Sequence, residues 1–196
     1  MRRVAAELGA SPMSLYNHVP NKAALLDGMA EYILSGVENA GIDPGTHWSE
    51  RARALMRAYR KMSLDYPRAV SLVHTRQAES PAAMRSIEHA LALADDAGFD
   101  GETSIRIMRA MLAYAAGSQI RDFSSPRPAE NQPDKDAALA MLDPAEFPHV
   151  RALRSQLLSP DPEADFEFGL DLLISSVTLL AQNNSGATAA GGPASR

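Results

Sequence analysis

The residues best suited to recognition chemistry lie between positions 11 and 22. Leu15 and Val19 are four residues apart, so on a helix they share an inward face and leave the residues around them pointing outward. Asparagine and serine side chains can hydrogen-bond to base edges or phosphates, a tyrosine hydroxyl can reach a phosphate, and methionine can touch a thymine methyl group. The outward set consists of Pro12, Met13, Ser14, Tyr16, Asn17 and His18.

Short helices on either side are predicted to position this set. Residues 4–8 carry apolar side chains at helical spacing, and Gly9 follows where a helix must stop and reverse. Ser11 can cap the second helix, Pro12 fits its first turn and Pro20 ends it. Two short helices joined by such a turn form a helix-turn-helix, whose second helix fits a DNA major groove. An ordinary three-helix segment of a bundle is the alternative, which the exposed polar set disfavours.

A longer helix is predicted from Lys22 to Glu38, with Asn21 as its cap. Lys22, beside the free N–H groups of the helix start, is placed to hold a phosphate, and Arg2 adds a second positive charge for DNA contact. The inward stripe of the helix at 22–38 consists of Leu25, Leu26, Met29, Ile33 and Val37.

The strings Arg3 to Ser11, Ser14 to Val19 and Asn21 to Asp27 together resemble the DNA-binding domain of TetR-family repressors, and most of all the tetracycline-repressor branch. The resemblance implies a homodimeric repressor that binds a palindromic operator and is released by a small hydrophobic effector. It also implies that the helix at 22–38 connects the DNA-binding head to the body and moves when the effector binds.

The family's head has a further helix before the helix-turn-helix, and we expect that helix to be absent from this chain. Either the start codon is placed too late or the chain is a truncated relative. In the second case the protein would bind a small molecule or a protein partner without binding DNA. We therefore expect weak DNA binding unless a partner surface completes the small core of the head.

Composition places the chain in the all-α class. Of its 196 residues 45% are hydrophobic and 22% charged, and strand-like alternation is almost absent. There is no cysteine and no apolar run long enough for a membrane span, so we expect a cytoplasmic protein that does not enter a membrane. The net charge is −5, but residues 1–22 carry three basic residues against one acidic residue, which leaves the acidic excess to the body.

The breaker-rich stretch from Gly41 to Thr46 divides the chain. Residues 1–40 are predicted to form the helix-turn-helix head and connecting helix, 46–182 an all-helical ligand-binding and dimerisation domain, and 183–196 a disordered tail. Helices at 103–123 and 165–182 are apolar on more than one face and predict the dimer contact. The second of these also resembles the closing helix of the tetracycline-repressor regulatory domain.

A pocket for an apolar effector is predicted between the body helices, because large aromatic and methionine side chains suit such a ligand. Its predicted walls are Trp48, Met56, Tyr59, Leu72, Met108, Met111 and Tyr114, with His74, Thr75, Arg76 or Gln119 as polar anchors. Simple core filling is the alternative for each of them. No catalytic constellation is recognisable, and no metal or cofactor is assigned, because Glu38 and Leu72 stand where the tetracycline repressor would carry its magnesium-chelate histidines.

Overall fold

The computed structural model describes residues 1–38, 43, 45–68, 81–124 and 132–190. Within these residues it consists of helices without a strand, which confirms the predicted all-α fold. The helices are α1 (Arg2–Glu7), α2 (Pro12–His18), α3 (Lys22–Glu38), α4 (Trp48–Asp65), α6 (Pro81–Asp96), α7 (Gly101–Ser124), α8 (Gln132–Ala140), α9 (Pro148–Ala152), α10 (Arg154–Leu158) and α11 (Pro162–Ala190).

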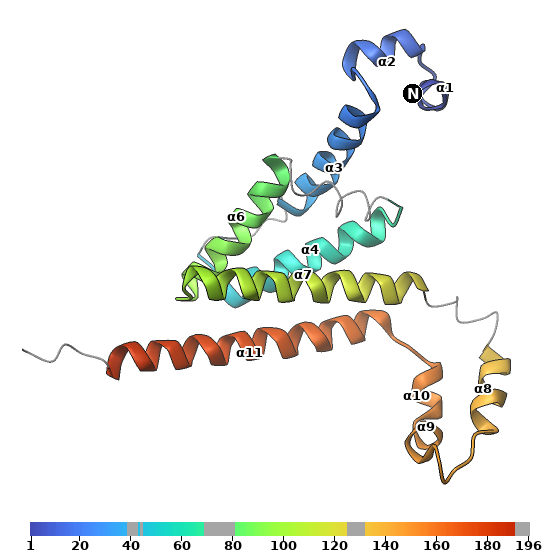
Figure 1. Cartoon of the computed structure of the whole chain (residues 1–196), viewed down its shortest axis with the longest axis vertical. Coiled ribbons are helices and arrows are strands. Elements are labelled where there is room, and N and C mark those ends of the chain that lie inside the picture. The colour runs from blue at the N-terminus through green and yellow to red at the C-terminus, as the bar shows by residue number, and fades with distance from the viewer. Residues whose placement is uncertain (39–42, 44, 69–80, 125–131, 191–196) are drawn as a thin grey trace, which may run out of the picture.

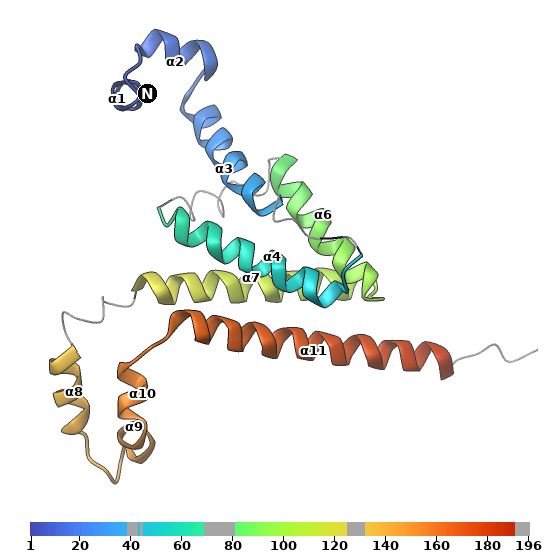
Figure 2. The same ribbon diagram turned by 180° about the vertical axis from the view of Figure 1, so that it is seen from behind.

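The head and the body are separate parts of the molecule. Helices α1 and α2 lie at one end of α3, away from the other helices, and the opposite end of α3 packs against α4 and α6 (Figures 1 and 2). Helix α4 packs against both α7 and α11, and α7 and α11 run side by side in opposite directions. Helix α3 is therefore the one described element that reaches from the head into the body.

One hydrophobic core joins the body helices. Phe166 and Leu170 of α11 are fully buried and pack in one cluster with Tyr59 of α4, Leu34 of α3 and Ala115 of α7. A side chain of this size contributes about 1.5–3 kcal/mol when it is fully buried, so these positions fix the arrangement of the helices. A second, smaller cluster forms around Phe99, just before the N-terminal end of α7.

The head folds as its sequence predicts in most details. Gly9 adopts a φ of 64°, and the Ser14 amide donates to the Ser11 hydroxyl over 3.1 Å, which caps α2. Ala5 is fully buried between α1 and α2, and Leu15 is half-buried. Leu8, which the sequence pattern placed on the inward face, is 67% exposed because it lies past the end of α1, beyond the contact that Ala5 makes.

The last helix is longer than predicted. Helix α11 begins at Pro162, with the Asp161 carboxylate accepting from the Ala164 amide, and continues to Ala190. A disordered tail was predicted from residue 183, but α11 continues to 190, because a helix that is already formed adds residues without a second nucleation cost. Residues 191–196 lie outside the described residues, as does most of the short helix predicted from Arg68 to Gln77.

Helices α8, α9 and α10 form an arm that projects from the body (Figures 1 and 2). Arg154 pairs with Asp136 over 2.8 Å, and the Arg151 guanidinium donates to the carbonyls of Ala140 and Leu142. The helix predicted from Pro148 to about Ser159 is interrupted at Leu153, which separates α9 from α10.

None of the described helices is long and apolar enough to cross a membrane.

Candidate functional site

The outer surface of α2 carries the polar residues that the sequence singled out. Met13 is 74% exposed and Tyr16 46% exposed, while Leu15 and Val19 are half-buried on the inner side of α2. The other outward residues, Pro12, Ser14, Asn17 and His18, are exposed as well. A seven-residue helix with an N-cap, a first-turn proline and a polar outer face has the form that a major groove accepts.

Two cationic side chains are exposed on the head, one of them at the capped start of α3. Asn21 caps α3, since its side-chain oxygen accepts from the Ala24 amide over 2.8 Å. Lys22 is the first residue of α3 and is exposed, and Arg2 is exposed at the first residue of α1. Both are available to contact a negatively charged partner from the head.

The pocket in the body has walls from α3, α4, α6, α7 and α11. It holds about 880 Å³ between its walls, counting the part that opens to solvent. Five residues predicted for the pocket do line it: Trp48, Met56, Tyr59, Met108 and Met111.

Burial has a marked effect on one of these residues. Tyr59 is 6% exposed, and removal of its ring from water raises its pKa to about 12. The phenol therefore remains neutral at any physiological pH. The wall of the pocket at α4 presents uncharged groups.

Two predicted pocket residues lie elsewhere. Tyr114 turns toward α11, where its ring stacks on Phe166 at 5.6 Å and its hydroxyl donates to the Phe166 carbonyl over 2.7 Å. Gln119 is buried about two turns beyond Met111 along α7, past the end of the pocket. Tyr114 is turned by about 120° around α7 from Met108, whereas Gln119 faces nearly the same way as Met108 but lies about three turns further along.

Other pocket residues were missed or cannot be placed. Leu72, His74, Thr75 and Arg76 lie outside the described residues. The wall from α6 was not predicted, although its stripe of apolar residues gave a signal; it comprises Ser86, Ile87, Ala90, Leu93 and Ala94. Leu34 and Val37 of α3 also line the pocket. Val37 belonged to the predicted inward stripe of α3, so the stripe was recognised without its role in the pocket.

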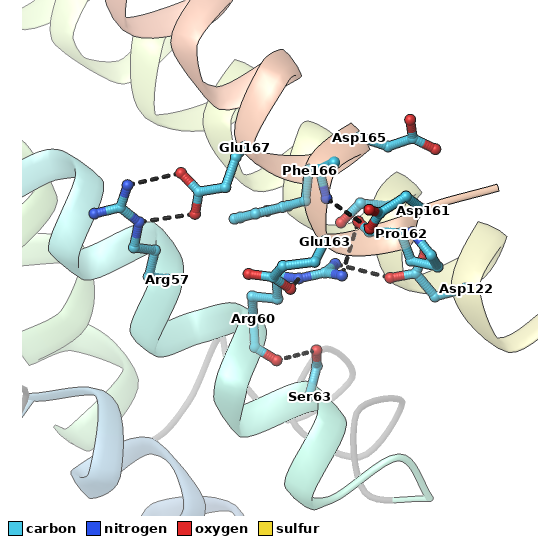
Figure 3. Close-up of polar contacts among 12 residues, drawn as sticks. Arg57, Arg60, Ser63, Asp122, Asp161, Pro162, Glu163, Asp165, Phe166 and Glu167 are labelled. Carbon is cyan, nitrogen blue, oxygen red and sulfur yellow. Dashed lines mark hydrogen bonds and ion pairs between the residues drawn. The ribbon is translucent and has the colours of Figure 1, made fainter.

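A ladder of ion pairs joins α4 to α11 (Figure 3). It was not predicted from the sequence. Arg57 makes a two-bond contact with Glu167, at 2.7 and 2.8 Å, and Arg53 pairs with Asp171. The hydrogen bond from Arg57 lowers the pKa of the Glu167 carboxyl. The signal for this ladder was available, because basic residues recur at helical spacing on α4 and acidic residues on α11.

Arg60 forms the most buried part of this ladder. Its guanidinium is 5% exposed, pairs with Asp122 of α7 over 2.8 Å and with Glu163 of α11 over 3.0 Å, and lies 4.6 Å from the centre of the Phe166 ring. Burial lowers the pKa of Arg60, but the hydrogen bonds to Glu163 and Asp122 outweigh this effect and raise it overall. The three helices α4, α7 and α11 are thereby fastened at one point (Figure 3).

An exposed apolar surface runs along α7 and α11. Phe168 and Leu172 are one turn apart on α11 and are 67% and 56% exposed. Leu179 and Leu180 continue this surface on α11, and Ile120 on α7 is 67% exposed. Both helices carry the two-sided apolar pattern from which dimerisation was predicted.

Metal ligands do not gather in the described parts of the chain, where no group of three or more His, Cys, Asp or Glu side chains converges. The exposed His47 has a structural role, since its ring nitrogen accepts from the Ser49 amide over 3.3 Å and caps α4. His18 is exposed on α2.

Comparison with known proteins agrees with this arrangement. The family described as "Tetracyclin repressor-like, C-terminal domain" matches residues 41–179. The HTH-type transcriptional repressor DrrR1 of Streptomyces coeruleorubidus is 29% identical over 199 residues, covering 96% of this chain and 73% of that protein. The tetracycline repressor protein class C of Escherichia coli is 27% identical over 176 residues, covering 88% of this chain and 78% of that protein.

A solved structure extends the likeness to three dimensions. The crystal structure of the Streptomyces coelicolor TetR family protein ActR in complex with actinorhodin has a TM-score of 0.75 and 27% sequence identity, covering 92% of this chain and 87% of that one. The family match spans the body helices, and the repressor relatives extend the likeness through the head. The chain belongs to the TetR family of transcriptional regulators.

Proposed function

We propose that the protein is a homodimeric repressor that binds a palindromic operator through α2 and is released by a small hydrophobic effector in the body pocket. One observation carries the proposal. Leu34 and Val37 line the pocket on the same helix whose first residue, Lys22, follows directly on α2 and its connecting turn. A ligand in the pocket therefore touches the helix that holds the DNA-facing residues.

Operator contact is assigned to the exposed residues of the head. Tyr16 and Lys22 would contact phosphates and set the position of α2, and Asn17 and Ser14 would hydrogen-bond to base edges. Met13 would touch a thymine methyl group. Arg2, Pro12 and His18 complete the contact set, which lies on one end of the molecule.

The dimer is assigned to α7 and α11. Their exposed apolar side chains would be covered by the same surface of a second copy, giving a two-fold contact. Two α2 helices would then reach two half-sites about one turn of DNA apart, or a multiple of it. The ligand would act by favouring the dimer conformation in which the two heads no longer match that spacing, to the extent that it binds this conformation more tightly.

The test begins with selection of DNA from a random pool by the full chain. We expect the selected sites to contain an inverted repeat. Replacing Tyr16 by Phe and Lys22 by Ala together should weaken binding to the selected site by about tenfold to 100-fold without changing the dimer mass in solution. Lys135→Ala, an exposed change on the arm, is the matched control and should leave binding unchanged.

Three results would contradict the proposal. The selected DNA could lack any repeat, the double variant could bind the selected site as tightly as the wild type, or the protein could remain a monomer while binding DNA. Each result can be read from anisotropy of labelled DNA together with light scattering.

A further inference from the structure

Gln119 of α7 has a buried amide that the rest of the described chain does not satisfy. The residue is 3% exposed, and among the described residues neither its amide nitrogen nor its amide oxygen has a hydrogen-bond partner. Close by on the same helix, the Asp122 Oδ1 atom is also buried without a hydrogen bond. A buried amide with its donor and its acceptor both unused costs free energy, and such groups are rare in folded proteins.

The position of Gln119 on α7 connects it with the pocket. Met108, Leu112, Ala115 and Gln119 recur at helical spacing on one face of α7, and the first two line the pocket. At 1.5 Å per residue, the interval from Met108 to Gln119 is about 16 Å along the helix. Ala115, which comes between the pocket and Gln119 on this face, is buried in the main core.

Helix α4 faces this stretch of α7 with an adaptable side chain. Arg60 pairs with Asp122 over 2.8 Å, so the second half of α4 lies along the end of α7. Tyr59 lines the pocket, and Met62, about one turn later on α4, belongs to the same core cluster as Ala115. Methionine is unbranched and adjusts its shape to its neighbours, and alanine presents only a methyl group. On these two helices, one flexible and one small side chain thus follow the pocket toward the buried amide.

We propose that Gln119 is the polar end of an extended effector site. The ligand is a long apolar body whose far end carries a group that both donates and accepts hydrogen bonds, such as a carboxamide. The inference rests on the proposed function, because it names the ligand class of the same pocket. The body would lie along the Met108–Ala115 face of α7 and displace Met62. A glutamine amide offers one acceptor oxygen and two N–H donors, so such an end group would satisfy both of its ends.

The unliganded protein provides the first test. Gln119→Met nearly keeps the volume of the side chain and removes the unpaired amide, so the melting temperature should rise by about 2 °C or more in circular dichroism. Gln156→Met is the matched control, because Gln156 is exposed on the arm, and it should change the melting temperature by less than about 1 °C. An unchanged or lower melting temperature in Gln119→Met would show that the amide is already satisfied and would overturn the inference.

Two rod-shaped fluorescent probes test the ligand class. The hydrocarbon 1,6-diphenyl-1,3,5-hexatriene is about as long as the interval from Met108 to Gln119. Its para-carboxamide differs only by an end group that donates and accepts hydrogen bonds. Trp48 is the single tryptophan of the chain and lies on the pocket wall, so energy transfer from Trp48 reports a probe bound there.

The carboxamide probe should depend on Gln119, and the hydrocarbon probe should not. Gln119→Met should raise the dissociation constant of the carboxamide by about tenfold or more, because two hydrogen bonds are lost, and leave that of the hydrocarbon within about twofold. Gln119→Leu, which also lacks the amide, should act in the same way if the first variant folds poorly. Gln156→Met should change neither dissociation constant.

Equal effects of Gln119→Met on the two probes would overturn the inference, as would no effect on either, which is the result expected if water satisfies the amide. Absence of energy transfer to both probes in the wild-type chain would overturn it as well. None of these measurements uses DNA. Discrimination through Gln119 in a protein that selects no operator would defeat only the repressor proposal, and its absence in a protein that binds its operator would defeat only this inference.

Discussion

Gly169 is the position at which one methyl group should have the clearest effect. A Cβ atom built there would lie 2.7 Å from two ring carbons of Tyr114 and nearer still to its hydroxyl oxygen. Carbon atoms pack at about 3.5 Å or more, so the ring must retreat by about 0.8 Å. Tyr114 is held where it is, because its hydroxyl donates to the Phe166 carbonyl and its ring stacks on Phe166.

The expected cost of Gly169→Ala follows from these contacts. Overpacking costs about 1–3 kcal/mol, and loss of the hydrogen bond to Phe166 adds about 1 kcal/mol. The better helix propensity of alanine returns about 1 kcal/mol. The free energy of unfolding should therefore fall by about 1–3 kcal/mol. Gly28→Ala is the matched control, because nothing lies within 4 Å of its added Cβ, and it should be neutral or stabilising by up to about 1 kcal/mol.

Urea unfolding followed by circular dichroism, at one fixed protein concentration, measures both variants. A double-mutant cycle with Tyr114→Ala isolates the clash, since in that background Gly169→Ala should no longer destabilise. The same loss in both backgrounds would refute the reasoning. Binding of the neutral fluorescent probe N-phenyl-1-naphthylamine in the pocket should remain within about twofold of wild type in Gly169→Ala, because the contact belongs to the α7–α11 packing and Tyr114 does not line the pocket.

Three further changes test the energetics of the body. Arg60→Met should lower the free energy of unfolding by about 3–5 kcal/mol in urea titrations, because it leaves the 9%-exposed Asp122 carboxylate with only the longer, 3.9 Å contact to Arg121. A loss under about 1 kcal/mol would contradict the buried pairing. Because the pKa of Tyr59 is raised in the folded state, ionisation of its phenol should lower the free energy of unfolding as pH rises from about 10 toward about 12. Tyr59→Phe should flatten this alkaline loss in urea titrations, and an unchanged pH dependence would contradict the burial of the phenol. Because the pKa of Glu167 is lowered in the folded state, its carboxylate contributes to the free energy of unfolding above its unfolded pKa, and this contribution is lost as pH falls. Glu167→Gln should therefore reduce the fall in the free energy of unfolding below pH about 4.5. The same fall in wild type and variant would contradict the contact with Arg57.

The head could be predicted from the sequence because its signals are local. A glycine with positive φ, a serine cap, a first-turn proline and an asparagine cap each determine a helix end through residues at most three apart. The all-α class follows in the same way from periodicity. Leu8 shows the limit of this reasoning, since its exposure depends on what packs against the head and on where α1 ends.

The pocket and the ladder could be predicted only in part, because both depend on how distant helices pack. Met108 and Tyr114 have similar apolar character, and only the rotation of α7 against α4 and α11 decides which of them lines the pocket. The pairing of Arg57 with Glu167 joins residues 110 positions apart. Composition also misled at the end of α11, where residues rich in Asn, Ser, Gly and Thr continue a helix that is already formed.

If the proposed function is right, α3 links occupancy of the pocket to the position of the head. At 1.5 Å per residue its 17 residues span about 25 Å, so a tilt of about 5° at the pocket moves the head by about 2 Å in each protomer. The chain has no cysteine, so Glu7→Cys, at an exposed site on α1, provides one spin label per protomer. Electron–electron double resonance would measure the label-to-label distance in the dimer with and without saturating N-phenyl-1-naphthylamine. We expect a shift of about 2–4 Å. The shift should be absent in Ala90→Leu, because Ala90 lines the pocket and the larger side chain fills it, and an identical distance with and without the probe would contradict the link through α3.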